Sequence, residues 1–427
     1  MQKLKNLRLI EMQLLIVPAL LALVGMLLVI LVPRQQVQWE AKDLWTSFVF
    51  IGLLIGTHLA LTLGLPKADQ LLLPLVSALT VFGLIMSQRL QTDGGSRDGI
   101  ASKQLLWIGL GYLVFVITAL GLRNLLLFKR YKYTFMLVGL VLTAAAAVFG
   151  TEINGARLWF RLGAFNFQPG ELLKICLVIF LAGYLDENRL LISPQRGRGF
   201  FNLPPLPYLG PMVAIWGISM VLLFVQKDLG PAELFFGVFL IMLYVASGRA
   251  SYVIAGLLVF AVSSVIAYNA FDYVQNRITA WINPWPYAQG RSYQIVQALF
   301  SFANGGIFGQ GLSSGAPYFI PEVHTDYVYA AIGEEVGLAG TLGIIGLNLL
   351  LFYRGFHVAL KTSNGFYQYL AIGLVALLGL QTFIIMGGVT KLIPLTGMTL
   401  PFISYGGSSI LINFFIAGLL VRISASD

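Results

Sequence analysis

The sequence has few charged residues, one cysteine and three histidines. Asp, Glu, Lys and Arg make up 11% of the 427 residues, whereas a soluble domain carries about 25%. This shortage excludes an ordinary soluble enzyme. Cys176 cannot form a disulfide within the chain. His58, His324 and His357 lie far apart in the sequence and do not indicate a metal site.

Apolar residues are abundant and occur in long runs. They make up 58% of the chain, and the mean hydropathy is +0.82. Runs near 20 residues predict membrane-spanning helices, and they are too continuous for the alternating pattern of a barrel. The net charge of +9 is spread over short loops, which indicates membrane topology and no nucleic-acid partner. The predicted fold is an all-α polytopic membrane protein.

The runs predict about twelve spans. The first resembles a signal peptide, but it exceeds the roughly 7–15 apolar residues usual there, and we interpret it as a retained helix. The predicted spans are 13–32, 44–64, 70–87, 104–121, 134–150, 171–185, 211–225, 230–246, 250–270, 328–352, 366–388 and 402–421.

Charge in the loops predicts the orientation. An even number of spans puts both termini on one side, and residues 122–133 carry four cations and no acid. Because cytoplasmic loops are enriched in Lys and Arg, both termini are predicted to be cytoplasmic.

This orientation places the 57-residue segment 271–327 outside. It contains NPWPYAQGRSYQ (283–294), NGGIFGQGLSSG (304–315) and IPEVHTDYVYAAIGEE (320–335). Loops beyond about 12–15 residues are often functional. A floppy connector is one interpretation. We favour a folded segment, because Ile295, Leu299 and Phe300 are interleaved with aromatic and turn-forming residues.

Several ionisable residues lie close to predicted spans, where they are costly and often functional. Glu171 and Lys174 share a helix face, so a structural ion pair and a ligand contact are both open. Asp228 lies in a short outer turn between two spans. Glu334 and Glu335 lie in the first turns of a span, where helix capping accounts for one of them but hardly for both.

Asp326 lies where the outer segment meets the tenth span, next to His324 and Thr325. A carboxylate between water and an apolar wall is suited to act as a base with a tuned pKa. It is equally suited to be a helix N-cap. The residues alone leave both roles open.

Cations on the same side are candidates for binding phosphate. Arg157, Arg161, Arg277 and Arg291 lie outside in the predicted topology, and guanidinium groups match phosphate oxygens through paired hydrogen bonds. Contact with anionic lipid headgroups is the alternative for each of them.

Glycine, proline and hydroxyl residues are dense between the last two spans, in GGVTKLIPLTG (387–397) and PFISYGGSS (401–409). They predict non-helical backbone near membrane depth, which is tolerated only inside protein or along a wet cavity. Lys391, Ser404 and Ser408 are the polar candidates there. A tight turn is the alternative to a shaped cavity wall.

Together these segments resemble the SEDS family, the shape, elongation, division and sporulation proteins that include RodA, FtsW and SpoVE. The resemblance runs from about residue 70 to the C-terminus. Its motifs are NGARLWFRLGAFNFQPGELLK (154–174), QKDLG (226–230), ALFSFANGGIFGQGL (298–312), IPEVHTDYVYAAIGEEVGLAG (320–340) and KLIPLTGMTLPFISYGGSS (391–409).

The resemblance implies a ten-helix catalytic core at 66–427, preceded by an additional helix pair at 1–65. It implies a peptidoglycan glycosyltransferase in the bacterial cytoplasmic membrane that polymerises lipid II into a nascent glycan during elongation or division. Asp326 falls on the essential acidic position of the family's HTD motif.

The other site residues follow as expectations. Glu171, Lys174 and Asp228 would line the polar end of the lipid groove, and His324 would orient Asp326 or pack against it. The pyrophosphate would be met by Arg157, Arg161, Arg291 or Lys391. No cofactor is predicted for certain, and a divalent cation is the alternative to these side chains.

The sequence departs from the family pattern at two motifs. QPSE reads QPGE at 168–171, and QPDLG reads QKDLG, with Lys227 in place of proline. The GGVTKLIPLTG form looks like the actinobacterial branch.

The resemblance also implies a partner, a class B penicillin-binding transpeptidase, because the sequence shows no cross-linking domain. Two other functions stay open: a lipid II flippase, and a non-catalytic scaffold for the transpeptidase.

Overall fold

The computed structural model describes residues 8–32, 44–91, 99–153, 156–163, 165–189 and 206–426. Parts of the predicted 1–65 segment (1–7 and 33–43) and of the 154–174 motif (154, 155 and 164) lie outside the described residues. The chain divides into two compact units. Unit 1 comprises Met1–Leu122, Thr279–Gly355 and Gln381–Ser426; unit 2 comprises Arg123–Ile278, Phe356–Leu380 and Asp427.

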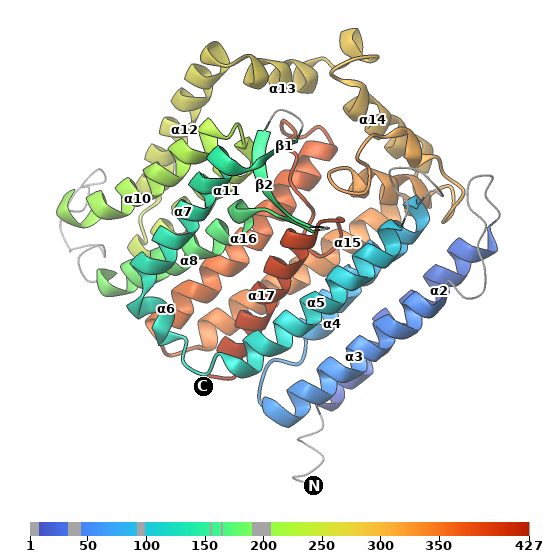
Figure 1. The fold of residues 1–427 in the computed structure, drawn as a ribbon, viewed down its shortest axis with the longest axis horizontal. Coiled ribbons are helices and arrows are strands. Elements are labelled where there is room, and N and C mark those ends of the chain that lie inside the picture. Colours follow the sequence, from blue (N-terminus) through green and yellow to red (C-terminus); the bar gives the residue numbers. More distant parts are fainter. Residues whose placement is uncertain are drawn as a thin grey trace. The chain divides into compact units, whose positions relative to one another are not determined.

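Unit 1 is built from long apolar helices and the segment before α15 (Figure 1). Its elements are α2 (Leu9–Leu31), α3 (Trp45–Gly64), α4 (Leu72–Leu90), α5 (Ile100–Gly121), η2 (Trp285–Tyr287), α14 (Tyr293–Gly305), η3 (Pro317–Phe319), most of α15 (Val328–Lys361), the end of α16 (Gly365–Val389) and α17 (Gly407–Ser424).

Helix α4 is at the centre of unit 1 and is buried on almost all sides. The N-terminal pair α2 and α3 covers α4 and α5, and α17 packs along α5 (Figure 1). Gly83 of α4 lies against the backbone of Ile403, because a Cβ at Gly83 would meet that carbonyl oxygen at 2.3 Å. This close approach holds the irregular segment before α17 against the central helix.

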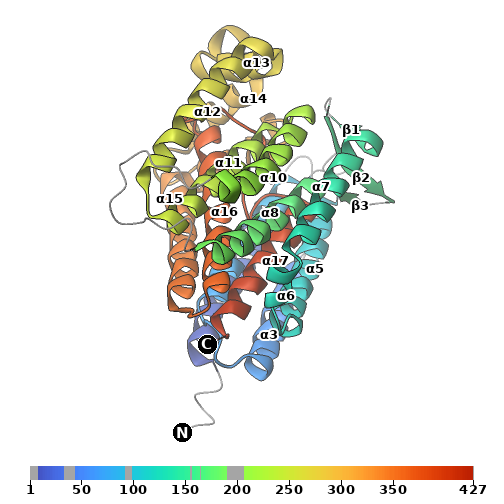
Figure 2. The same ribbon diagram turned by 90° about the vertical axis from the view of Figure 1, so that its left-hand side faces the viewer.

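Unit 2 contains a small sheet in addition to its helices. Its elements are α6 (Leu126–Arg130), α7 (Lys132–Phe149), β1 (Thr151–Ile153), β2 (Ala156–Leu162), β3 (Phe165–Phe167), α8 (Pro169–Glu187), α10 (Leu206–Val225), α11 (Leu229–Ser247), α12 (Ala250–Ala270), most of α13 (Asp272–Ile282), the end of α15 and most of α16. The antiparallel order is β1-β2-β3, and β2 lies against the end of α7 (Figure 2). The sequence pattern did not predict these strands.

The described residues include ten helices that are long and apolar enough to cross a membrane. The chain is therefore a multi-pass, mainly helical membrane protein, as predicted. The other two predicted spans coincide with α8, which carries charges at both ends, and with α10, whose apolar part is Leu209–Val225. A total of twelve spans stays a prediction.

The segment 271–327 is folded. It forms α13, η2, α14 and η3, and Ile295, Val296 and Ala298 of α14 are buried. This favours the folded interpretation over the floppy connector. That the segment lies outside the cell stays a prediction.

Helix α15 is broken at Gly337, whose φ of 72° interrupts the helical hydrogen bonds. The 305–311 segment fills the break. Leu338 and Ala339 donate their N–H groups to Gly306 and Ile307, and the Glu334 and Glu335 carbonyls accept from the neighbouring residues 310 and 311, all at 2.9–3.0 Å. Because backbone groups in a membrane protein need partners within the protein, this segment and the first part of α15 form one folded element.

Candidate active site

Asp326 lies two residues before α15 and is partly exposed. The first helical carbonyl is that of Tyr327, which accepts from the N–H groups of residues 330 and 331 at 2.9 and 3.3 Å. Asp326 therefore stands one residue before the N-cap position. Its own N–H donates to the Glu322 carbonyl at 3.3 Å, within a short turn that exposes the HTD segment.

The irregular backbone between α16 and α17 packs against the HTD segment. Ser404 Oγ donates to the Thr325 carbonyl at 2.6 Å, and Tyr405 N donates to the His324 carbonyl at 2.8 Å. The rings of His324 and Tyr405 lie 5.5 Å apart. The predicted non-helical backbone is thus present, and its contacts hold the two residues that precede Asp326.

Gly397 leaves room beside the Asp326 carboxylate. A Cβ at Gly397 would lie 3.3 Å from Asp326 Oδ2, and its φ of 74° is one that residues with side chains rarely adopt. Only glycine permits this conformation at no steric cost. The carboxylate is therefore bordered by backbone rather than by a side chain on this side.

Glu334 and Glu335 are both buried, one turn and more beyond Asp326. Glu335 forms an ion pair with Arg89 of α4, whose Nη2 also donates to the Gly315 carbonyl at 2.8 Å. The two glutamates accept further hydrogen bonds from Ser301 Oγ (2.7 Å), Ser313 N (3.1 Å) and Ala316 N (2.8 Å). Neither carboxylate is merely a helix cap; together they tie the 301–316 segment to α15.

Three further candidates, Lys391, Arg291 and Ser408, also belong to unit 1. Lys391 has a φ of 63°, accepts from Trp281 Nε1 at 3.1 Å and donates from Nζ to Ile282 O at 3.4 Å. Arg291 is exposed and lies 3.7 Å over the ring of Tyr287. Ser408 is buried in the first turn of α17.

A second polar group lies in unit 2. Lys174 Nζ donates to Glu171 Oε1 at 2.6 Å, and both side chains are almost fully buried. Asp228, the residue before α11, interacts electrostatically with both and with Arg277 of α13. The predicted Glu171–Lys174 pair is thus present, and its role as a ligand contact stays a prediction.

The surroundings of Asp228 change its acidity. Burial raises the pKa of Asp228 from 3.8 to about 6; Lys174 and Arg277 oppose the rise, and Glu171 adds to it. Lys227, just before it, has a φ of 59°. Proline fixes φ near −65°, so a proline could not adopt the turn that this chain makes at the position where the family motif has one.

Arg157 and Arg161 lie on β2, where alternate residues share a face. Both are exposed on the face that also carries Trp159. Arg157 Nε lies 3.3 Å from Glu152 Oε2. Because such exposed pairs are weak, both guanidinium groups are accessible to an anion.

Among the described residues, no group of three or more His, Cys, Asp or Glu side chains is placed to hold a metal ion. The divalent cation left open by the sequence stays a prediction.

Two residues of these groups, Arg89 and Gly397, were not singled out from the sequence. Arg277 was predicted as a candidate to bind phosphate on the outer side, and its place beside Asp228 was not predicted. A signal existed for Arg89, because an arginine ending an apolar helix is costly. The pairing of each residue depends on segments far apart in the chain.

The sequence matches the model of the FTSW_RODA_SPOVE family of cell cycle proteins over residues 69–427. It is 39% identical over 422 residues to peptidoglycan glycosyltransferase RodA of Mycobacterium tuberculosis, covering 97% of this chain and 90% of that protein. It is 35% identical over 369 residues to the probable peptidoglycan glycosyltransferase FtsW of Geobacter sulfurreducens, covering 84% and 95%.

Solved structures resemble the fold. Rod shape determining protein RodA of Thermus thermophilus has a TM-score of 0.61 and 28% identity, covering 84% of this chain and 96% of that chain. A chain of a peptidoglycan synthase complex, described as coordinating polymerization and crosslinking, has a TM-score of 0.68 and 28% identity, covering 84% and 97%. The protein therefore belongs to the FtsW, RodA and SpoVE family of cell cycle proteins.

Proposed function

We propose that the protein is a peptidoglycan glycosyltransferase that polymerises lipid II into glycan strands in cell elongation or division. The observation that carries the proposal is Asp326, partly exposed before α15 and bordered by the backbone of Gly397, in a chain similar to enzymes named for this activity. Residues 66–427 would form the catalytic core, and the pair at 1–65 would be an addition to it.

The proposed orientation puts both termini in the cytoplasm and Asp326 on the outer face of the cytoplasmic membrane. Two contacts support it. Asp69 N donates to Ser424 Oγ at 2.9 Å, which puts the start of α4 and the end of α17 together. Arg89, at the other end of α4, pairs with Glu335 near the Asp326 end of α15. Asp326 thus lies at the end of unit 1 opposite the C-terminus.

In the proposed reaction, Asp326 accepts the proton from the 4-hydroxyl of the acceptor N-acetylglucosamine. The oxygen then bonds to C1 of the donor N-acetylmuramic acid, and the bond from C1 to the carrier breaks. Undecaprenyl pyrophosphate leaves with the electron pair, and the configuration at C1 inverts. A positioned base contributes about 10²–10⁴-fold.

The leaving pyrophosphate carries charge, so cations would stabilise it better than an acid. Arg157 and Arg161 are candidates because they are exposed on one face of β2. Arg291 and Lys391 are candidates in unit 1. Glu171, Lys174 and Asp228 would contact the polar headgroup, His324 would orient Asp326, and Ser404 and Ser408 would shape the neighbouring wall.

A class B penicillin-binding transpeptidase is the proposed partner. A structurally similar chain belongs to a complex described as coordinating polymerization and crosslinking. Glycan strands made by this protein would be cross-linked by that partner, and membrane lipids would surround both.

The test is lipid II polymerisation by purified protein in detergent, with and without a transpeptidase partner. We expect glycan strands from the unmodified protein, and a loss of at least about 100-fold in Asp326→Asn. Asp272→Asn, which changes an exposed acid in the first turn of α13, is the matched control. Detergent removes the second compartment, so a flippase would make no glycan. Full activity in folded Asp326→Asn would indicate a scaffold role or another base.

A further inference from the structure

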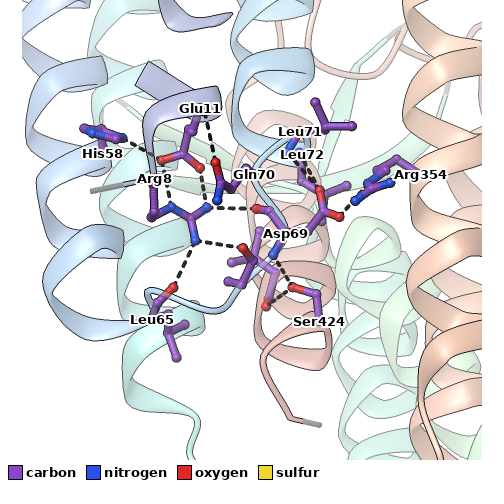
Figure 3. Close-up of polar contacts among 12 residues, drawn as sticks. Arg8, Glu11, His58, Leu65, Asp69, Gln70, Leu71, Leu72, Arg354 and Ser424 are labelled. Atoms are coloured by element: carbon purple, nitrogen blue, oxygen red, sulfur yellow. Dashed lines mark hydrogen bonds and ion pairs between the residues drawn. The ribbon is translucent and has the colours of Figure 1, made fainter. Parts of the chain in front are cut away.

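Charged and polar residues meet around the turn between α3 and α4 (Figure 3). This turn lies at the end of unit 1 opposite Asp326. We call this group the Arg8 cluster. Its members are Arg8, Glu11, His58, Asp69, Arg354 and Ser424. None of them takes part in the proposed reaction, and the first three precede the residues matched by the family model.

Arg8 is fully buried and uses all five of its guanidinium N–H groups. Nε and Nη2 contact the two oxygens of Glu11. Nη1 donates to the carbonyls of Leu65 and Ala68, both at 2.9 Å, and Nη2 donates to the Asp69 carbonyl at 2.8 Å. A lysine has three N–H groups and could not replace it. Arg8 thus fixes the turn that joins α3 to α4.

The backbone of Arg8 is strained. Its φ of 45° is left-handed, which costs roughly 1–2 kcal/mol for a residue with a side chain. Such strain persists where the surroundings over-determine the conformation. Five hydrogen bonds from one buried side chain are sufficient for this. His58 Nδ1 lies 2.7 Å from Glu11 Oε1 and links α3 to the same group (Figure 3).

Asp69 connects this turn to three helices. Its Oδ1 accepts from the N–H groups of Leu71 and Leu72 at 2.9 and 3.3 Å, at the start of α4. Its Oδ2 accepts from Arg354 Nε of α15 at 2.5 Å, and its N–H donates to Ser424 Oγ of α17 at 2.9 Å. The side chain of Asp69 is 5% exposed.

Two ion pairs therefore join α15 to the two ends of α4: Arg354 pairs with Asp69 just before α4, and Glu335 pairs with Arg89 at the end of α4. Asp69 and Arg89 are 20 residues apart, and their partners Arg354 and Glu335 are 19 apart. The two spacings agree to within one residue, and the break at Gly337 lies between Glu335 and Arg354 in α15. Two matched pairs on antiparallel helices prevent α15 from sliding along α4.

We propose that Arg8 is a positioning residue for α15: by holding the α3–α4 turn it keeps Asp69 on Arg354 and so sets the register of α15, and of Asp326 before it, against α4. The catalytic consequence rests on the proposed function. The structural claim, that the N-terminal pair acts on the far end of α15, stands on these contacts alone.

The experiment is hydrogen–deuterium exchange of the full-length protein in lipid nanodiscs, read over residues 322–336. We expect Arg8→Gln and Asp69→Asn each to raise exchange there by about tenfold, as local opening becomes easier. Asp69→Asn retains the Oδ1 acceptor for α4. Lys361→Gln removes an exposed cation from the last turn of α15 and should leave exchange unchanged. Arg8→Lys, which keeps the charge, should fall between the unmodified protein and Arg8→Gln.

The double variant Arg8→Gln/Asp69→Asn separates the proposal from simple anchoring. If Arg8 acts through Asp69, the double variant should exchange at 322–336 no faster than Asp69→Asn alone, because coupled residues are not additive. Additive effects, or a lower melting temperature with unchanged exchange at 322–336, would overturn the proposal.

Polymerisation gives the catalytic readout. In Arg8→Gln we expect kcat for lipid II to fall several-fold while KM stays the same, because Arg8 is remote from the substrate. Unchanged kcat beside raised exchange would overturn the link to Asp326. If Asp326→Asn remained active, the proposed function would fail, and the exchange result would still decide the structural claim.

Discussion

Arg8 and Asp326 are both ionisable residues at the ends of apolar helices in unit 1, and their surroundings differ. Arg8 is fully buried and has a partner for each N–H group. Asp326 is partly exposed, lies on irregular backbone and borders Gly397. Both lie close to α15, one through Asp69 and Arg354, the other two residues before the helix starts.

The difference separates charges that hold the fold from charges that can meet a substrate. A buried guanidinium with saturated hydrogen bonds cannot exchange partners without a large cost. A partly exposed carboxylate beside a glycine is more accessible to a hydroxyl group than a fully buried guanidinium is. The variants below therefore change the burial of a charge, the number of its hydrogen bonds or the size of the residue beside it.

The largest effect is expected at the buried Arg89–Glu335 pair. Glu335→Leu leaves the Arg89 guanidinium buried beside an apolar side chain, and we expect a loss of about 3–5 kcal/mol in unfolding free energy. The double variant Arg89→Met/Glu335→Leu should regain most of it, because no uncompensated charge remains. Thermal unfolding in detergent measures both. If the double variant lost as much unfolding free energy as Glu335→Leu and Arg89→Met lose together, the two side chains would not be energetically coupled.

The next effect tests the open side of Asp326. Gly397→Ala places a Cβ 3.3 Å from Asp326 Oδ2, in a strained backbone conformation, and we expect polymerisation to fall roughly tenfold. Gly248→Ala is the matched control, since Gly248 has a similar φ of 65° and nothing within 4 Å of the added Cβ. Both variants should lose about 1 kcal/mol of stability. Equal activities of the two variants would contradict a role for the space beside Asp326.

Asp228 is partly buried, and its raised pKa predicts that the stability of the protein depends on pH. Its raised pKa of about 6, against 3.8 ordinarily, means that between pH 4 and 6 the folded protein keeps a proton that the unfolded chain releases. Stability should therefore fall as pH rises through this window. A full shift corresponds to about 3 kcal/mol, and partial exposure reduces it to about 1–2 kcal/mol.

Asp228→Asn removes this titration. Melting temperatures of the unmodified protein and of Asp228→Asn should be similar near pH 4 and should separate as the pH rises to 7, with Asp228→Asn the more stable, because only the unmodified protein loses this contribution. Parallel curves would show that Asp228 is not held in its neutral form by burial.

The smallest effect on stability is expected at Arg157, because its side chain is exposed. Arg157→Gln breaks a surface pair with Glu152 and should cost less than about 0.5 kcal/mol. If Arg157 meets the pyrophosphate, the same variant should raise KM for lipid II while an exposed arginine elsewhere, tested as Arg130→Gln, does not. Unchanged saturation kinetics would remove Arg157 from the proposed binding residues.

Most boundaries of the predicted spans lie within five residues of the helix ends, although α15 continues nine residues past its predicted span to Lys361, and the sheet was not predicted. The predicted span 328–352 begins where α15 begins, whereas 402–421 begins five residues before α17. There, Phe402 has a φ of 64° and the chain is tied to the HTD segment by Ser404. Such contacts are not local, so an apolar run alone cannot show where its helix starts. The strands β1–β3 are too short to give a period.

The candidate site was predictable as a set of residues and not as a geometry. The HTD motif indicated Asp326, and the i,i+3 spacing indicated the Glu171–Lys174 pair, which the structure contains. Arg277 beside Asp228, and Arg89 beside Glu335, come from segments 49 and 246 residues away in the chain. No local pattern connects such positions.

The sequence by itself determined that this is a multi-pass membrane protein and where most of its helices lie, because a bilayer core forces each backbone segment to satisfy its own hydrogen bonds. Only the tertiary structure decided which charges are saturated and which stay accessible. Arg8, Asp69 and Arg354 are joined across 346 residues of chain. Side-chain partners are chosen by packing in three dimensions, and packing has no period along the sequence.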